Sequence, residues 1–246
     1  MLRHTQLWLS SIAVAALMAS AGAQGTWDET ANGGGDAGDL PATAQVVLGS
    51  GPLTQITGSI GTGGDVDMFA ILITDPANFY AHTGTSPATS IDTKLHLFDS
   101  NGRPLWMNDD RPGDVAGLGI GSLQSYIGGG SAPGNYRSSD APNTPGSASW
   151  SLPGPGLYYL AVSHWPRNAA SGGNQQFHSD FPYRVIKSPY AAQANNPVDG
   201  WLGTSTTTGV YTIYLRGVEF VPEPASMVAL GAGLAGLLGL RRRRKA

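Results

Sequence analysis

The chain has 246 residues, with 14 Lys and Arg, 17 Asp and Glu, and no cysteine. The lack of cysteine excludes disulfides, thiol nucleophiles and cysteine-ligated zinc sites. With 35 glycines and 17 prolines the composition favours turns and strands over helices, and the length suffices for a sizeable core without covalent cross-links.

The first 23 residues have the pattern of a secretory signal peptide. Arg3 and His4 form a short basic region, residues 7–18 are almost wholly apolar, and residues 21–23 form an A-x-A cleavage sequence. We therefore expect a signal helix that is removed, and a mature chain that begins near Gln24. An acidic segment at residues 24–43 follows.

Short strand-like segments dominate the body, which we place at residues 44–220. They lie at residues 45–48, 55–60, 67–73, 94–98, 103–107, 156–162 and 209–216, and are rich in apolar, aromatic and β-branched residues. Residues 99–102, Asp-Ser-Asn-Gly, supply a hairpin turn. The pattern predicts an all-β fold, an antiparallel, jelly-roll-like β-sandwich. Its expected core includes Phe69, Ile71, Leu95, Leu97, Tyr159, Ala161, Ile213 and Leu215.

Two insertions rich in Gly, Pro and Ser interrupt this pattern, at residues 112–155 and 165–208. We expect long loops there, with one candidate strand at residues 183–186. Loops of this length in compact domains are usually functional or disordered. Binding specificity is therefore expected in these two insertions.

The order of residues in the tail, 221–246, indicates a sorting signal. Pro222, Glu223 and Pro224 precede an apolar run at residues 225–240, and a basic cluster ends the chain: Arg241, Arg242, Arg243, Arg244 and Lys245. This arrangement resembles the tail of the PEP-CTERM family of exported bacterial proteins. The resemblance implies processing by an exosortase-type membrane protease and delivery to the cell surface or its exopolysaccharide.

The apolar run of the tail is short for a transmembrane helix. Its sixteen residues span about 24 Å, against roughly 30 Å for a hydrocarbon core, although the arginines can extend to the interface. A temporary membrane anchor fits this length best, and a short permanent anchor is the alternative.

The charge balance of the exported body is acidic. Residues 24–221 carry eight Lys and Arg against sixteen Asp and Glu, a net charge of −8. Such a surface does not neutralise phosphates, so nucleic acid is excluded as a partner. Calcium prefers several oxygen ligands, and the candidate ligands are Asp28, Asp36, Asp39, Asp65 and Asp67. The alternative is that such aspartates cap turns.

The order of strands and acidic turns also resembles the bacterial pre-peptidase C-terminal domain. The matching segments are residues 64–69, 92–102, 108–110, 154–162 and 211–215, within a region of about 44–217 that the two insertions interrupt. The resemblance implies a small β-sandwich that accompanies secreted enzymes or surface proteins. It carries no catalytic residues with it.

Motifs of catalysis are absent from the sequence. It contains no G-x-S-x-G, no H-E-x-x-H and no phosphate-binding glycine loop. His164 and His178 could combine with Asp180 and a serine, but chance explains this set better than a triad does. We therefore predict a protein that is not an enzyme.

Aromatic residues in the second insertion are the candidate ligand-binding side chains. Trp165, Tyr190 and Trp201 could stack on sugar rings, although most such residues fill the core of a sandwich. The sequence thus favours a structural or adhesive protein of the cell surface or extracellular matrix. A carbohydrate-binding module and a secreted hydrolase with an unrecognised site are the alternatives.

Overall fold

The computed structural model describes residues 25–62, 64–84, 87–111, 118, 120–128, 152–178 and 183–223. This part of the chain is built from fourteen strands and contains no α-helix. The prediction of an all-β fold is confirmed for it. None of its segments is a helix with the length and apolarity that a membrane crossing requires. The expected signal helix, most of the first insertion and the tail from Pro224 onward lie outside the described residues.

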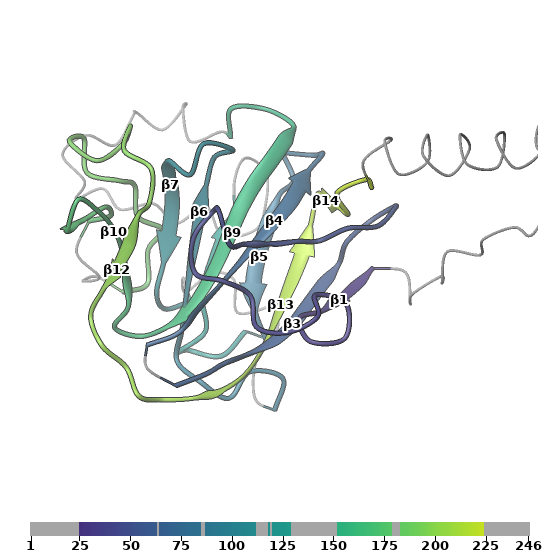
Figure 1. Ribbon diagram of the computed structural model, residues 1–246, viewed down its shortest axis with the longest axis horizontal. Helices are drawn as coiled ribbons and strands as arrows, with labels where there is room; N and C mark the ends of the chain where they lie inside the picture. The colour runs from purple at the N-terminus through teal and green to yellow at the C-terminus, as the bar shows by residue number, and fades with distance from the viewer. Residues whose placement is uncertain are drawn as a thin grey trace, which may run out of the picture.

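The first large sheet has five strands in the order β1-β3-β13-β5-β8 (Figure 1). The strands are β1 (Thr26–Asp28), β3 (Gln55–Ile60), β13 (Gly209–Arg216), β5 (Tyr80–Thr83) and β8 (Tyr126–Gly128). All neighbours are antiparallel except β1 and β3, which run parallel. The expected strands at residues 55–60 and 209–216 are therefore central in this sheet.

The second large sheet follows the order β14-β4-β9-β6-β7. The strands are β14 (Val218–Glu219), β4 (Val66–Ile73), β9 (Gly156–His164), β6 (Thr93–Phe98) and β7 (Pro104–Asn108), and β2 (Gln45–Val46) pairs in parallel with β4. Strands β6 and β7 form the expected hairpin. Asp99 closes its turn by accepting hydrogen bonds from the amides of Asn101 and Arg103.

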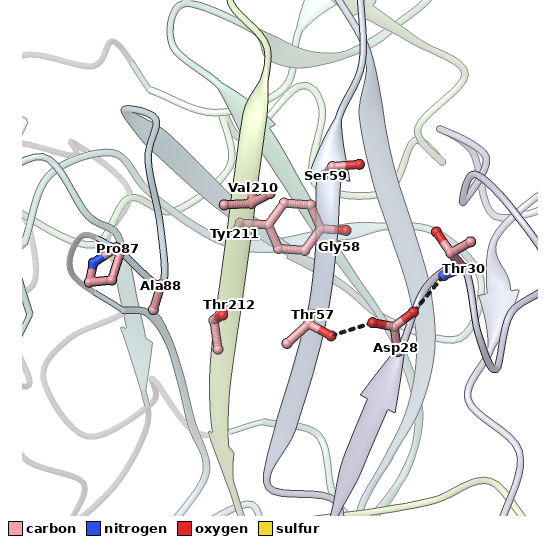
Figure 2. Close-up of a pocket in the computed structure, with 10 residues that line it drawn as sticks. All are labelled: Asp28, Thr30, Thr57, Gly58, Ser59, Pro87, Ala88, Val210, Tyr211 and Thr212. Carbon is pink, nitrogen blue, oxygen red and sulfur yellow. Dashed lines mark hydrogen bonds between the residues drawn. The ribbon is translucent and has the colours of Figure 1, made fainter.

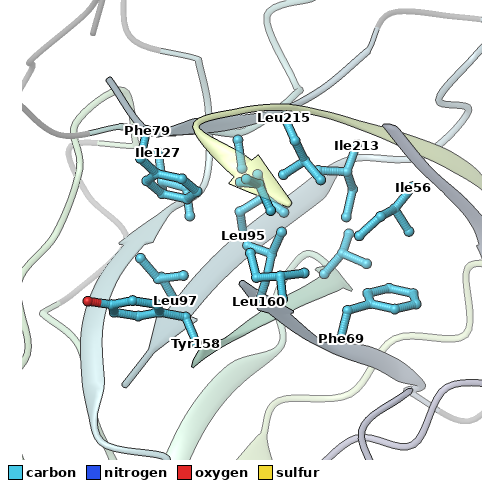
Figure 3. Close-up of a cluster of buried hydrophobic side chains, with 14 of the residues drawn as sticks. Ile56, Phe69, Phe79, Leu95, Leu97, Ile127, Tyr158, Leu160, Ile213 and Leu215 are labelled. Atoms are coloured by element: carbon cyan, nitrogen blue, oxygen red, sulfur yellow. The ribbon is translucent and has the colours of Figure 1, made fainter. Parts of the chain in front are cut away.

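A main hydrophobic cluster lies between these two sheets (Figure 3). Because side chains alternate along a strand, Phe69 and Ile71 of β4 face this cluster together with Leu95 and Leu97 of β6 and with Ile213 and Leu215 of β13. These six predicted core positions are confirmed. On β9, Ala161 is buried as predicted, but in a second cluster, against which Tyr159 packs while partly exposed; Tyr158, Leu160 and Val162 point into the main cluster.

A second hydrophobic cluster covers the opposite face of the second sheet. Met68, Phe98 and Ala161 belong to it, together with Ala169 and Phe177 from the second insertion. This insertion forms a three-stranded sheet in the order β11-β10-β12, with β10 (Asn168–Ser171), β11 (Asn174–Gln175) and β12 (Gly200–Leu202). The insertion is therefore a third layer that buries the outer face of β4, β6 and β9.

The expected strand at residues 183–186 is wrong. Residues 183–185 form a turn and bend, and the pairing that follows them consists of isolated bridges, including those of Lys187 with Met107 of β7 and of Pro189 with Phe177. The apolar run that suggested a strand instead buries Ile186 against the main cluster.

Both ends of the folded body meet at one segment of chain. The carbonyl oxygen of Gly25 accepts hydrogen bonds from the amides of Thr54 and Gln55, and the amide of Leu53 donates to Val218. In Figure 1, β1 and β14 accordingly lie at the opposite end of the view from β10 and β12. The last backbone hydrogen bond before Pro222 runs from the Val221 amide to the Val47 carbonyl, over 2.8 Å.

Candidate metal site at the N-terminal loop

The acidic segment that follows β1 is an ordered loop built on side-chain hydrogen bonds. Asp28 Oδ1 accepts from the amides of Thr30 and Ala31, and Thr57 Oγ1 donates to Asp28 Oδ2. The hydrogen bond from Ala31 is the main cause that lowers the pKa of Asp28. Asp28 therefore caps a turn, which was the alternative to its role as a calcium ligand.

Glu29 closes the loop from inside. The side chain is buried, and its two carboxylate oxygens accept hydrogen bonds of 2.9 Å from the amides of Ala37 and Ser59. Gln45 holds the same loop from β2, because its Nε2 donates to the carbonyl oxygens of Glu29 and Gly35. The two amides therefore fix the Glu29 carboxylate between the loop and β3 of the first sheet, and Gln45 fixes the loop backbone to β2.

Asp67 is buried between the two large sheets. It lies on β4 with the same parity as Phe69 and Ile71, and its side chain is fully inaccessible. Neither carboxylate oxygen forms a hydrogen bond of good geometry among the described residues, and its nearest polar neighbours are the Tyr211 hydroxyl and the Glu29 carboxylate. Burial, followed by the negative charge of Glu29, raises the pKa of Asp67 to about 10.

Asp36 completes a group of three carboxylates. Ligand oxygens of Glu29, Asp36 and Asp67 all lie within 4.8 Å of one another. Asp36 is exposed, whereas the other two are buried, so the group reaches from the core to solvent. Desolvation is the main cause that raises the pKa of Glu29 and of Asp36. At Glu29 the hydrogen bonds from the two amides oppose this rise, whereas at Asp36 the charges of neighbouring carboxylates add to it.

Tyr211 of β13 lies beside this group from the first sheet. Burial, and then the charges of Asp67 and Glu29, raise the pKa of its phenol well above the ordinary value. The hydroxyl lies beside the Asp67 carboxylate, although the two form no hydrogen bond of good geometry. Figure 2 shows the ring extending from β13 across Gly58 of β3.

The two remaining predicted ligands, Asp39 and Asp65, lie near the group without belonging to it. Asp65 Oδ2 accepts a hydrogen bond from the amide of Gly61, and the backbone carbonyl of Asp39 accepts one from Trp201. Both carboxylates lie within electrostatic range of Arg167 and support its positive charge. Of the five predicted ligands, the structure thus brings together Asp36 and Asp67, and adds Glu29.

A second group of acidic side chains lies where β6 begins and β7 ends. Asp92, Asp109 and Asp110 also place ligand oxygens within 4.8 Å of one another. Burial is the first cause, and the charge of Asp110 the second, that raises the pKa of Asp92 to about 6. Asp109 is the buried member of this group and already takes part in another interaction, whereas Asp92 and Asp110 are half-buried.

A shallow groove of about 410 Å³ crosses the first sheet beside the acidic loop (Figure 2). It is lined by Asp28, Thr30, Thr57, Gly58, Ser59, Pro87, Ala88, Val210, Tyr211 and Thr212. Hydroxyl groups and small side chains dominate this lining, and the one acidic group, Asp28, is already engaged as a turn cap. The groove offers hydrogen-bonding groups without a catalytic arrangement.

The predicted ligand aromatics have different environments. Trp165 and Tyr190 are exposed, and the Tyr190 ring contacts His178 in a tilted arrangement with ring centroids 4.2 Å apart. Trp201 is partly buried and packs edge-on against His96 and Phe98. Among the described residues no ring contact joins the three, so Trp201 has a structural position and the other two remain candidates.

One serine and histidine pair occurs within the described residues. Ser205 Oγ lies 2.7 Å from His164 Nδ1, and the same hydroxyl accepts a hydrogen bond from the Thr207 amide. Asp180, the predicted third member of a triad, lies outside the described residues. Sequence reasoning identified His164 but not Ser205, because many serines are available and no motif marks this one.

The PEP-CTERM protein-sorting motif matches residues 220–244. The motif implies an exported protein that is processed by exosortase, a membrane protein, and sorted to the cell envelope. The predicted sorting residues Pro222, Glu223, Pro224 and Arg241 to Arg244 all lie within the match. No curated protein matches the chain.

Proposed function

We propose that the protein is delivered by exosortase-type processing to the bacterial cell surface or its exopolysaccharide matrix, where a β-sandwich body serves as a non-catalytic structural or binding module. The observation that carries this proposal is the position of the sorting motif, residues 220–244, directly at the end of the folded body. Phe220 and Val221 still donate backbone hydrogen bonds to Gly51 and Val47. Cleavage beyond Pro222 would therefore leave every strand of the described body in place.

The C-terminal end of the folded body is paired with strands of the second sheet, and this supports a role in surface display. Strand β14, at the edge of the second sheet, pairs with β4, and Leu48 bridges to Val221. A load on the tail would act on these pairs, and the main hydrophobic cluster lies directly behind them through Val218. Strand pairing and hydrophobic packing therefore attach the start of the tail firmly to the body.

The sorting residues can be tested by localisation of the full-length chain in its host. Glu223→Ala, or removal of residues 241–245, should leave unprocessed precursor in the membrane fraction, as measured by cell fractionation and by mass spectrometry of the C-terminus. Glu219→Ala, in β14 and four residues upstream, makes the same charge change outside the P-E-P sequence and should be processed normally. Normal processing and surface yield of both sorting variants would overturn the proposal.

The Ser205 and His164 pair is the observation in favour of a hydrolase as the alternative. A serine hydrolase requires an activated hydroxyl, so a fluorophosphonate probe should label Ser205 in the full-length chain if the pair is catalytic. We expect no labelling above that of Ser205→Ala. The Ser205 hydroxyl also accepts a hydrogen bond from the Thr207 amide, as serine hydroxyls do in local turns. Labelling that disappears in Ser205→Ala, but persists in Ser90→Ala, would contradict the non-catalytic assignment.

Exposure of Trp165 and Tyr190 favours carbohydrate binding as the form that a binding role would take. Polysaccharide prepared from the host matrix should then retain the full-length chain, and Trp165→Ala combined with Tyr190→Ala should reduce retention at least several-fold. Equal retention of the double variant would show that Trp165 and Tyr190 do not bind the polysaccharide.

A further inference from the structure

The carboxylate of Asp67 occupies an environment that a charged group does not tolerate alone. Its two oxygens are fully buried and form no hydrogen bond of good geometry among the described residues, although the Tyr211 hydroxyl and the Glu29 carboxylate lie beside them. Buried polar atoms are almost always hydrogen-bonded, and a buried carboxylate generally pairs with a cation or ligates a metal. The charged neighbours of Asp67 within the described part of the chain are themselves carboxylates, those of Glu29 and Asp65.

The neighbours of Asp67 supply further oxygen ligands in place of a counter-ion. Glu29 and Asp36 bring carboxylate oxygens to within 4.8 Å of those of Asp67. Calcium binds oxygen at roughly 2.3–2.6 Å, so opposite ligands on one ion are separated by at most about 5 Å. The three side chains can therefore contact a single ion.

The Glu29 carboxylate is oriented in advance. Each of its oxygens accepts one backbone amide, from Ala37 and from Ser59, and retains a second lone pair. Hydrogen bonds of this kind orient metal ligands in many protein sites. Asp36, at the exposed edge, gives the group an open path to solvent.

We propose that a calcium ion binds between the carboxylates of Glu29, Asp36 and Asp67, and clamps the N-terminal acidic loop to β4. The three oxygen ligands come from the end of β1, from the loop and from the second sheet, so the ion adds a link between these parts of the chain to the hydrogen bonds that already join them. This clamp does not depend on the sorting function, because its residues are remote in sequence from residues 220–244.

The donor set selects calcium among the common divalent ions. All three ligands are carboxylates, and no His or Cys joins the group, which disfavours zinc. Magnesium requires a near-ideal octahedron and retains several waters, whereas calcium accepts irregular oxygen ligands. A site formed by an irregular loop and a strand therefore fits calcium better than magnesium.

The test uses the full-length chain in detergent, stripped with chelator and titrated with CaCl₂ or MgCl₂ at matched ionic strength. We expect CaCl₂ to raise the melting temperature and MgCl₂ to raise it much less. Asp36→Asn is exposed and should fold normally, yet it should weaken calcium binding at least tenfold by calorimetry. Asp75→Asn makes the same charge change at an exposed turn away from the group and should bind as the unaltered chain does.

Asp67→Asn separates the proposed clamp from a general effect of charge. The amide removes the buried acid, so the chelator-treated variant should be as stable as the unaltered chain or more stable, while its response to CaCl₂ disappears. No calcium binding by the unaltered chain, or unchanged affinity in both Asp36→Asn and Asp67→Asn, would overturn the proposal. Sorting of these variants should remain normal, so the two proposals can fail separately.

Discussion

Trp201 donates a hydrogen bond from its indole Nε1 to the backbone carbonyl oxygen of Asp39 over 2.7 Å, and so joins two segments that are 162 residues apart. The same indole packs edge-on against His96 and Phe98 of β6. It therefore links the small sheet of the second insertion both to the acidic loop and to the outer face of the second large sheet.

Trp201→Phe should destabilise the protein by about 1–3 kcal/mol, because the hydrogen bond to Asp39 is lost and the smaller ring leaves part of the packing surface uncovered. Urea unfolding of the full-length chain, followed by fluorescence, measures this loss. Trp165→Phe is the matched control, since the Trp165 side chain is exposed and should change stability by less than about 0.5 kcal/mol. Equal effects of the two substitutions would show that the third layer is held without the indole.

Truncation of the main cluster has a larger expected effect. Ile71 and Leu97 are fully buried between the two large sheets, so Ile71→Ala or Leu97→Ala should each cost about 2–5 kcal/mol of unfolding free energy. The midpoint of urea unfolding at an unchanged slope measures this cost. Val210→Ala, on the solvent face of β13, should lower the midpoint far less. A small change at both buried positions would contradict the described packing.

The sequence predicted the main strands because alternation and β-branched content are local signals. Strands β3 and β13 match the expected ranges, and the β6–β7 hairpin follows from Asp99 and Gly102, which adopts a positive φ of 76°. The sequence could not show which side chains of β9 face the main cluster, because both faces are largely buried and the alternation that marks an inner side is lost. The third layer was missed because β10, β11 and β12 are short and polar, and are defined by contacts with distant Met68 and Phe98.

The candidate metal group shows the same limit. Composition placed acidic residues near the mature N-terminus, and Asp36 and Asp67 were among the candidates. The position of each residue relative to β4 determines which of them meet. Asp67 lies on the core-facing side of β4, whereas Asp65 precedes the strand and lies at the turn with Gly61. The sequence could not single out Glu29 as a ligand, because only the fold of the loop onto Ser59 brings its carboxylate inward.

Stability should depend on pH through His96. The imidazole is fully buried in the second cluster with both ring nitrogens unpartnered among the described residues, and burial followed by the charge of Lys94 lowers its pKa well below the ordinary value. The unfolded chain takes up a proton below about pH 6.5 and the folded chain does not. The contribution of His96 is therefore complete above that pH and is lost as pH falls, by about 1.4 kcal/mol per pH unit.

His96→Phe tests this pH dependence, because a phenyl ring fits among Phe98, Phe177 and Trp201 without a titrating group. Unfolding free energies of the full-length chain between pH 7.5 and 5 should fall less steeply in the variant than in the unaltered protein. Identical slopes in the two proteins would show that His96 is not the group responsible.

Gly58 is a strand position where only hydrogen fits. A Cβ atom at this residue would collide with the Tyr211 hydroxyl and with the Glu29 carboxylate. Gly58→Ala should therefore shift one or both side chains and cost about 1–3 kcal/mol of unfolding free energy, because the surrounding core leaves little room to adjust. The same shift moves Glu29 relative to Asp67, so the calcium-induced rise in melting temperature should shrink. Gly156→Ala at the start of β9 is the matched control, since its Cβ would meet no atom within 4 Å. If Gly58→Ala keeps both the stability and the calcium response of Gly156→Ala, the close approach of Tyr211 and Glu29 across β3 does not hold in solution.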